Sequence, residues 1–392
     1  MKVLIVAEYY PRADDPTLGI WAHRQAVAAR DAGAEVRVLV LHRPVPPLAA
    51  LRALDLGAAR RALAQPRTLE RDGLRIDYMP YVSPPRPWSY ASWGAWAAPL
   101  LRRALARIRR RFGFELVHAH YAVPAGDAVR RAAAGVPLLV SVHGGDVYGP
   151  HSGARTVRTT LAQARIVLAN SAGTARRCLE HGAAAAATRV VHLGADLPAP
   201  TSPADPRPPG PPRLVTVGNL IERKRHADVV AALPALRRRI ADIRYVIVGD
   251  GPRRAALLEL ASSLGVADIV ELRGRLPHDR AVELARSAAL FVLPSVDEAF
   301  GVSYIEAMAG GVPAIGSRGE DGPEEIAAAG DGIALVAPGD PVGLAERIGN
   351  LLGDPGRLAA MGRAARATVQ REFTWERCGQ LTVEAYADAL ER

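Results

Sequence analysis

The sequence predicts an α/β protein with two doubly wound domains, and two observations indicate this fold class. Short apolar runs typical of buried strands alternate with segments of helical periodicity along most of the 392 residues, too long a chain for one ordinary core. A proline-rich stretch, residues 198–212, interrupts the series near its middle. We therefore expect a first domain over residues 1–197, this stretch as linker, a second domain over 213–374, and a C-terminal helix over 375–392 that packs back on the first domain.

The first domain opens as a strand, a loop, a helix and a second strand, the beginning of a doubly wound sheet. Glu8–Gly19, the loop after the first strand, is rich in Pro, Asp and Gly but lacks the G-x-G-x-x-G turn, so no dinucleotide cofactor is expected there. Residues 48–63 are expected to form a helix or an ordered insert. The expected strands are Val3–Ala7, Glu35–Leu41, Leu74–Tyr81, Leu116–His120, Leu138–His143, Ile166–Ala169 and Val190–Leu193.

The second domain repeats this alternation, and no shorter repeat period is visible. Its expected strands are Arg213–Val217, Arg244–Val248, Val270–Leu272, an apolar run ending at Pro294, Pro313–Gly316 and Ile333–Val336. Its expected helices include His226–Arg239, Asp279–Ala288, Val302–Ala309, Pro341–Leu352 and Pro355–Glu372, before the final helix Glu376–Leu390.

A helix expected from about Tyr90 to Phe112 joins aromatic residues to a basic end. Trp88, Tyr90, Trp93 and Trp96 lead it, and arginines crowd its last turns up to Arg111. Such a segment fits a helix lying on an anionic membrane surface, with Trp88–Arg111 as the contact. The alternative is a surface helix whose aromatic side chains pack into the core.

Composition narrows the classes of function. The net charge of +10 favours anionic partners, although no nucleic-acid-binding module is recognisable, so no nucleic acid partner is expected. Cys178 and Cys378 stand far apart, no metal-ligand spacing occurs, and P-loop and nucleophile-elbow motifs are missing from the sequence. With no pattern of a signal peptide or a membrane span, we expect a cytoplasmic protein, with peripheral attachment to the inner face of the plasma membrane as an option.

The stretch Phe291–Pro313 carries the most chemistry. Glu298 lies in a short loop after an apolar strand, and Glu306 lies eight residues later in a small-residue helix. Ligands bind at the carboxyl ends of strands in open parallel sheets, and the N–H groups around Gly301 at the start of that helix suit a phosphate. The alternative is a surface loop with two solvated glutamates.

Two further loops follow strand ends. Gly218 and Asn219 come directly after a strand and lead to Arg223 and Lys224, which are suited to neutralising a diphosphate, although basic loops are often only solvated. In the first domain, His143, Gly144, Gly145 and Asp146 come directly after a strand. The two glycines leave room beside the His143 imidazole, which can donate or accept a hydrogen bond. His118 and His120, on the preceding strand, are expected to support that site, and a structural role for His143 is the alternative.

These motifs together resemble the retaining, GT-B-fold glycosyltransferases of family 4. The E-x7-E pattern of Glu298–Glu306, the blocks SVHGGDVYG and VGNLIERKR, and the terminal FTWERC stretch carry the resemblance, which covers nearly the whole chain. Within the family the opening is similar to cell-surface polysaccharide enzymes of the teichuronic acid type. The resemblance implies GT-B architecture, two Rossmann-like domains facing a cleft, with the nucleotide-sugar donor held mainly by the second domain.

The resemblance also implies roles for single residues. Glu306 would bind the ribose, Glu298 and His143 the donor sugar near the reaction centre, and Lys224 the diphosphate. The remaining implied donor contacts are the loop residues Gly19, Gly218, Asn219 and Arg223 and the turn Phe300, Gly301 and Val302, and His120 and Asp146 lie near the acceptor. The family usually has Arg where Asn219 stands and Gly where Ala299 stands, so the first role is expected to pass to Arg223.

The implied reaction is transfer of a sugar from a nucleotide diphosphate to a glycan or lipid-linked acceptor, with no metal and no further cofactor. Fixed positive charge on the diphosphate would lower the barrier, and the two glutamates would position ligands and not act as an acid and base pair. Two alternatives stay open. One is a GT-B epimerase or a transferase acting on soluble acceptors, and the other is a non-catalytic nucleotide-binding protein on membranes.

Overall fold

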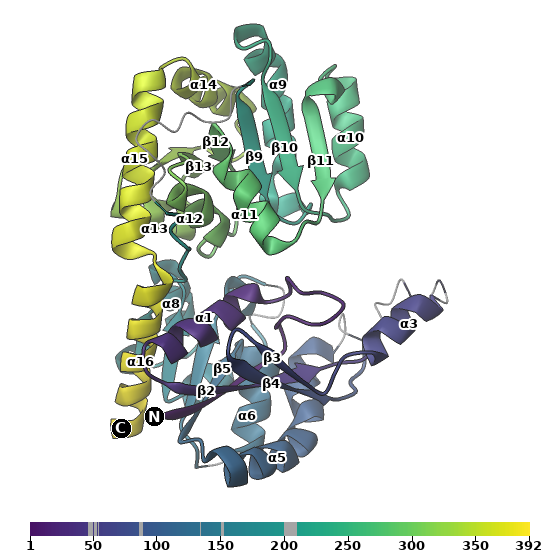
Figure 1. Ribbon diagram of the computed structural model, residues 1–392, viewed down its shortest axis with the longest axis vertical. Helices are drawn as coiled ribbons and strands as arrows, with labels where there is room; N and C mark the ends of the chain where they lie inside the picture. Colours follow the sequence, from purple (N-terminus) through teal and green to yellow (C-terminus); the bar gives the residue numbers. More distant parts are fainter. Residues whose placement is uncertain are drawn as a thin grey trace. The chain divides into compact units, whose positions relative to one another are not determined.

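The computed structural model describes residues 1–45, 50, 53, 55–85, 89–133, 135–149, 153–199 and 210–392. The chain forms two compact units, one of residues 1–193 with 375–392, and one of residues 194–374 (Figure 1). Most of the proline-rich stretch, Trp88 and part of the expected segment 48–63 lie outside the described residues.

The first unit is built on an eight-stranded sheet in the order β3-β4-β2-β1-β5-β6-β7-β8. All neighbours pair in parallel except β3 and β4. The order of the parallel strands is that of a Rossmann-like sheet, in which the strand order reverses between β1 and β5. The strands are β1 Lys2–Ala7, β2 Glu35–His42, β3 Thr68–Arg71, β4 Leu74–Pro80, β5 Leu116–His120, β6 Leu138–Val142, β7 Ile166–Ala169 and β8 Thr188–Val190.

Both faces of this sheet are buried, which explains why its strands appear as continuous apolar runs. In β1, Leu4 and Val6 enter one core, while Val3, Ile5 and Ala7 enter the other. The last helix, α16, packs against α1 from the other end of the chain (Figure 1). The helices of this unit are α1 Ile20–Asp31, α3 Leu56–Leu63, α5 Trp93–Phe112, α6 Asp127–Ala132, α7 Arg155–Gln163, α8 Ala172–Glu180 and α16 Trp375–Glu391.

The second unit has a six-stranded parallel sheet in the order β11-β10-β9-β12-β13-β14, again the Rossmann-like order. Its strands are β9 Arg213–Val217, β10 Arg244–Val248, β11 Val270–Gly274, β12 Leu290–Val292, β13 Ala314–Ser317 and β14 Ile333–Val336. Its helices are α9 His226–Arg239, α10 Arg254–Ser263, α11 His278–Arg286, α12 Val302–Ala309, α13 Asp321–Ala329, α14 Pro341–Leu352 and α15 Pro355–Glu372. The predicted class, two doubly wound α/β domains, is confirmed.

The sequence-based assignment was wrong in several element limits and missed one strand. The strand expected at Val190–Leu193 is β8 and ends at Val190, because the ladder to β7 closes with the bond from Val191 N to Ala169 O. The strand expected to reach Pro294 ends two residues earlier, at Val292. Strand β3 was not predicted, since its polar sequence TLER lies at the sheet edge and lacks an apolar run.

Helix α5 divides its side chains between the core and solvent. The Trp93 ring is buried, Tyr90 beside it is buried too, and both donate hydrogen bonds to backbone carbonyls, of Pro84 and Val123. Trp96 and Leu100 are instead 53% and 42% exposed. Among the described aromatic residues of this segment, the packed-helix interpretation is therefore correct for Tyr90 and Trp93 and wrong for Trp96. No helix within the described part of the chain is long and apolar enough to span a bilayer.

Candidate active site

The strand order of the second unit reverses between β9 and β12, and ligands of open α/β sheets bind outside the carboxyl ends of strands at this point. The two loops that leave these strands are residues 218–225 and 293–301. A backbone hydrogen bond of 2.8 Å from Val296 N to Arg223 O joins them. The sequence-predicted loops therefore meet at the place where the fold favours a ligand.

Lys224 and Glu298 form the central contact of this site. The Lys224 ammonium donates to Oε2 of Glu298, and the Ser295 hydroxyl donates to the same oxygen at 2.8 Å. Arg223 Nη1 lies 3.8 Å from it. The side chains of Lys224 and Glu298 are only 12% and 9% exposed, so this charge pair is largely shielded from solvent.

The environment decides the charge of Glu298. Burial raises its pKa, but the charges of Lys224 and Arg223 and the hydrogen bonds from Lys224 and Ser295 outweigh burial, so the pKa falls below its usual range. Glu320 accepts the backbone N–H of Glu298 at 3.1 Å, and burial raises the pKa of Glu320. Glu298 is thus an ionised carboxylate at neutral pH.

The turn before α12 depends on Gly301, whose φ of 90° lies in the left-handed region. A Cβ atom there would come within 2.4 Å of the Tyr304 ring. Phe300 is buried against Phe373, with ring centroids 5.5 Å apart, so only its backbone is suited to a ligand. Val302 begins the helix, and the first N–H groups of any helix lack intrahelical partners.

Glu306 lies apart from Glu298 in its contacts. Its Oε1 is 3.4 Å from Nε2 of His278 at the start of α11, and its backbone carbonyl accepts a hydrogen bond of 3.1 Å from Arg286 Nε. The two glutamates therefore have different partners, which fits separate positioning roles better than a solvated loop. His278 was not singled out from the sequence, because its partner is distant in the chain.

Packing within the protein does not by itself explain the residue types at Gly218 and Asn219. A Cβ atom at Gly218 would meet only the aliphatic chain of Lys224, at 3.8 Å, so protein packing alone does not require glycine here. The Asn219 side chain is exposed. Gly249 and Gly251 do approach this loop closely, since a Cβ there would come within 2.0 Å of Gly218 O and 2.6 Å of Leu220 O, respectively.

In the first unit, β5 and β6 bring three histidines together. His120 Nδ1 and His143 Nε2 are 2.9 Å apart, and the two rings stack with an angle of 6° between their planes. His118 also stacks on His120, with centroids 4.6 Å apart, and hydrogen-bonds to Ser141 and Tyr386. His118 is thus supporting structure, whereas His120 touches the candidate residue His143 directly.

These imidazoles are neutral. Burial lowers the pKa of His118 and His143 to about 3 and that of His120 well below its usual value. Nδ1 of His143 and Nε2 of His120 are buried and have no hydrogen-bond partner among the described residues. Such unmatched polar atoms are costly unless water or a ligand meets them, which makes His143 a candidate ligand contact.

The Asp146 side chain is held by hydrogen bonds from the backbone. Its carboxylate accepts the backbone N–H groups of Ala122 at 2.9 Å and His143 at 3.3 Å, tying the turn after β6 to the chain after β5. Burial raises its pKa to about 7, against the lowering effect of these bonds. Asp146 therefore acts by positioning the His143 backbone.

The backbone conformation and the close packing at Gly19 both require a glycine. Its φ is 61°, and a Cβ atom would come within 2.2 Å of the Tyr9 carbonyl oxygen. The aromatic rings near His143 were not foreseen: Trp21 lies 6.2 Å from it and Tyr121 5.1 Å, between ring centroids. Trp21 Nε1 is a further buried donor without a partner among the described residues.

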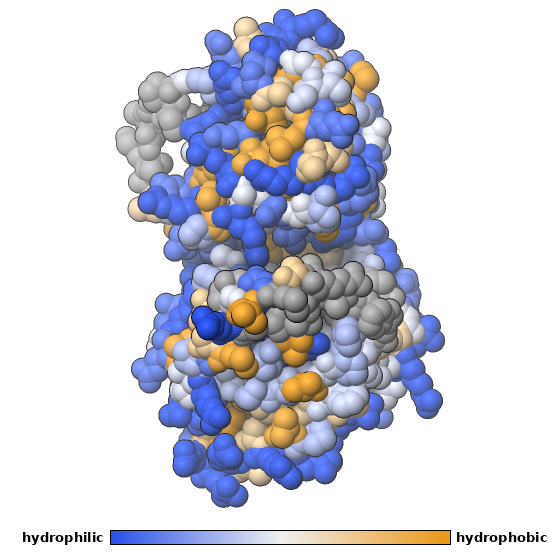
Figure 2. Space-filling view, turned by 90° about the vertical axis from the view of Figure 1, so that its right-hand side faces the viewer, coloured by the Kyte–Doolittle hydropathy of each residue, from blue (hydrophilic) through white to orange (hydrophobic). Residues whose placement is uncertain are grey.

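No group of three or more His, Cys, Asp or Glu side chains that could hold a metal ion occurs among the described residues. The face of the molecule shown in Figure 2 is largely hydrophilic, with hydrophobic residues gathered in several groups. The candidate site residues of the second unit thus combine Lys224 and Arg223 with two separately held carboxylates.

Comparisons with known proteins define the class. A model described as Glycosyltransferase Family 4 matches residues 18–198, and one described as Glycosyl transferases group 1 matches residues 201–368. Sucrose-phosphate synthase from Thermosynechococcus elongatus, a solved structure, has the same fold, with a TM-score of 0.75, 21% identity, and coverage of 100% of this chain and 99% of that one. The fold is that of the GT-B glycosyltransferases.

Two relatives add sequence similarity. D-inositol 3-phosphate glycosyltransferase from Nocardia farcinica is 32% identical over 306 residues, which cover 71% of this chain and 67% of that protein. GDP-mannose-dependent alpha-(1-6)-phosphatidylinositol monomannoside mannosyltransferase from Mycolicibacterium smegmatis is 33% identical over 187 residues, 46% of this chain and only about half, 49%, of that protein. This chain belongs to the group 1 glycosyltransferases of family 4. The prediction of a glycosyltransferase is confirmed.

Proposed function

We propose that this glycosyltransferase moves a sugar, with retention of anomeric configuration, from a nucleotide diphosphate to a glycan or lipid-linked acceptor of cell-surface polysaccharide or glycoconjugate synthesis. The observation that carries the proposal is the Lys224–Glu298 contact at the carboxyl ends of β9 and β12. It places a cation and an ionised carboxylate where a doubly wound sheet binds its ligand. The GDP-mannose named for the mycobacterial relative supports a nucleotide-sugar donor.

The proposed step breaks the bond between the sugar C1 and the phosphate oxygen, and the electron pair goes to the diphosphate. Lys224, Arg223 and the first N–H groups of α12 would bind the developing charge, so no resident metal and no further cofactor is proposed. The acceptor hydroxyl forms its bond to C1 on the same face. Its proton passes to the departing phosphate oxygen, and Glu298 holds hydroxyls of the donor sugar.

The first unit would supply the sugar and acceptor contacts. His143 is neutral, so one ring nitrogen donates and the other accepts a hydrogen bond. Its Nδ1 has no protein partner among the described residues, which leaves it suited to a sugar hydroxyl. His120 and Asp146 would keep the imidazole and its backbone in place.

A membrane-associated acceptor fits the exposed side of α5. Trp96, Leu100, Arg103, Arg107 and Arg110 recur at helical spacing and form one exposed stripe, which we call the α5 stripe. Apolar side chains beside arginines bind anionic lipid by combining burial with charge attraction. We therefore propose peripheral attachment through this stripe, at the cytoplasmic face of the plasma membrane.

The test is a panel of UDP-, GDP- and ADP-sugars assayed for thermal stabilisation, followed by transfer to soluble sugars and to polyprenyl-linked sugars, with and without a chelator. A donor that binds only the folded protein raises its melting temperature. We expect stabilisation, chelator-insensitive transfer, and a product with the anomeric configuration of the donor by NMR. Isomerisation of the donor without acceptor would overturn the proposal in favour of an epimerase, and binding without turnover would indicate a non-catalytic protein.

A further inference from the structure

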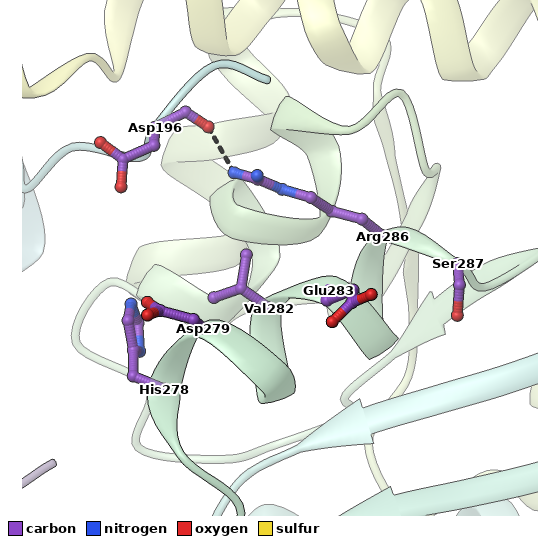
Figure 3. Close-up of a pocket in the computed structure, with 7 residues that line it drawn as sticks. All are labelled: Asp196, His278, Asp279, Val282, Glu283, Arg286 and Ser287. Carbon is purple, nitrogen blue, oxygen red and sulfur yellow. Dashed lines mark hydrogen bonds between the residues drawn. The ribbon is translucent and has the colours of Figure 1, made fainter. Parts of the chain in front are cut away.

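A pocket of about 370 Å³ lies in the second unit beside α11. Figure 3 shows its lining side chains along this helix, with Asp196 on the opposite side. The lining residues are Asp196, His278, Asp279, Val282, Glu283, Arg286 and Ser287. A volume of this size, with several charged groups, is in the range of small-molecule sites.

Two residues of this pocket hold Glu306, which is not itself part of the lining. His278 Nε2 lies 3.4 Å from Glu306 Oε1, and Arg286 Nε donates to the Glu306 carbonyl at 3.1 Å. Arg286 also donates to the carbonyl of Asp196 across the pocket (Figure 3). The side chain and the backbone of Glu306 are therefore both anchored from α11.

The anchoring by Arg286 leaves little freedom between α11 and α12. A Cβ atom at Gly310, just after α12, would come within 2.6 Å of Arg286 Cγ, so the arginine stem lies directly on the end of that helix. The helix is thereby fixed, and the remaining freedom of Glu306 lies in its side-chain torsions. The contact of His278 with the Glu306 carboxylate restricts these torsions.

We propose that His278 is a positioning residue for the nucleoside of the donor. Its ring nitrogen holds one oxygen of Glu306, so that the carboxylate is already oriented to accept hydrogen bonds from the ribose hydroxyls, and the adjoining pocket receives the nucleoside. This inference rests on the proposed function, because it takes Glu306 as the ribose ligand. A carboxylate accepts several hydrogen bonds at once, so the contact with His278 leaves capacity for a ribose.

The physical gain is preorganisation. A glutamate that must order its side chain on binding loses rotamer entropy, and a side chain already held in the bound geometry avoids much of that loss. Loss of the holding contact should therefore weaken the recognition of ribose hydroxyls and leave contacts to the diphosphate unchanged.

The experiment compares the binding of UDP, GDP and ADP with that of their 2′-deoxy counterparts by calorimetry. We expect the wild-type protein to prefer its ribonucleotide roughly tenfold, the value of one well-made hydrogen bond. His278→Leu should reduce this ratio to about twofold or less. His278→Gln, whose amide N–H replaces the ring N–H, should retain most of it.

The ratio is measured within one variant, so a loss of folded protein cancels. The control is Glu259→Gln, an exposed change on α10 outside the pocket lining. If Glu306→Gln loses the preference while His278→Leu keeps it, the role of His278 is refuted and that of Glu306 stands. If Glu306→Gln keeps the preference, or if the wild type shows none, the ribose role of Glu306 falls and the inference falls with it. If none of the three nucleotides binds, the proposed function itself is wrong.

Discussion

The ammonium of Lys224 is ion-paired with the carboxylate of Glu298, although both residues are expected to bind the donor. The two charges compensate each other in a largely shielded place, where an isolated charge is expensive. A diphosphate would therefore compete with Glu298 for Lys224, while Ser295 and Arg223 remain beside the carboxylate. Glu298 thus supplies the counter-charge for Lys224 from within the protein.

Replacement of Lys224 by Met is expected to lower the free energy of unfolding by about 2 kcal/mol, because it leaves the Glu298 carboxylate buried without its main partner. The estimate lies below that for an isolated buried charge, since the Ser295 hydroxyl and Arg223 stay near the carboxylate. Urea unfolding monitored by fluorescence measures this change.

The matched control is the double variant Lys224→Met with Glu298→Gln. Removing both charges should recover most of the lost stability, and the difference gives the coupling between the two residues. Both variants should bind nucleotide diphosphates weakly. Equal stability of the single and double variants would show that the pair contributes nothing to folding.

Acid should destabilise the first unit through its buried histidines. The folded pKa of His118 and His143 is about 3, far below the ordinary 6.5. The unfolded chain therefore takes up protons first, so their contribution to stability is complete above pH 6.5 and is lost as the pH falls toward 3. Asp146, with a pKa raised to about 7, has the opposite sign and favours the folded state as the pH falls through that value.

His118→Gln isolates the contribution of one histidine to the pH dependence of stability. His118 contacts Ser141 and Tyr386 and is not a candidate ligand contact. Each such histidine contributes a slope of at most about 1.4 kcal/mol per pH unit. We expect the fall in unfolding free energy between pH 6.5 and 4.5 to be shallower in the variant. Parallel curves for the two proteins would contradict a neutral His118.

The sheets could be predicted from sequence because both faces of each parallel strand are buried. Arg213–Val217 and Arg244–Val248 were assigned with their observed limits, since apolar runs identify such strands directly. Strand β3 was not predicted, because its residues at the sheet edge do not form an apolar run.

The candidate site residues were selected from local motifs, and these motifs did not identify the contact partners of those residues. His118 meets Tyr386 across 268 positions of sequence, and His278 meets Glu306 across 28. Nothing local marks such pairs, because strand order and helix packing bring them together. Trp21 was missed for the same reason: its proximity to His143 depends on how α1 lies over the sheet.

The two glycines of the donor loops should respond differently to alanine. Gly301→Ala places an alanine at a left-handed φ and brings its Cβ into a clash with the Tyr304 ring. We therefore expect the free energy of unfolding to fall by about 2 kcal/mol and donor binding to be lost. At Gly218 the surrounding protein atoms leave room for a methyl group, so Gly218→Ala should change the free energy of unfolding by less than about 0.5 kcal/mol. If a ligand approaches the Gly218 backbone closely, nucleotide affinity should still fall. Unchanged affinity in Gly218→Ala would exclude that approach.

The α5 stripe should bind vesicles containing anionic lipid. We expect Arg103→Gln with Arg107→Gln to reduce co-sedimentation with phosphatidylglycerol vesicles several-fold, and Trp96→Ala to reduce it as well, because charge and apolar burial act together. The binding should weaken with added salt.

The same helix offers a matched control. Arg102 donates to the Arg131 carbonyl, and Arg109 lies over the Phe114 ring, so both point away from the stripe. Arg102→Gln with Arg109→Gln removes the same charge, and we expect it to leave most of the vesicle binding intact. Equal losses in the two double variants would mean that net charge alone drives association, and no loss in either would exclude α5 as the membrane contact.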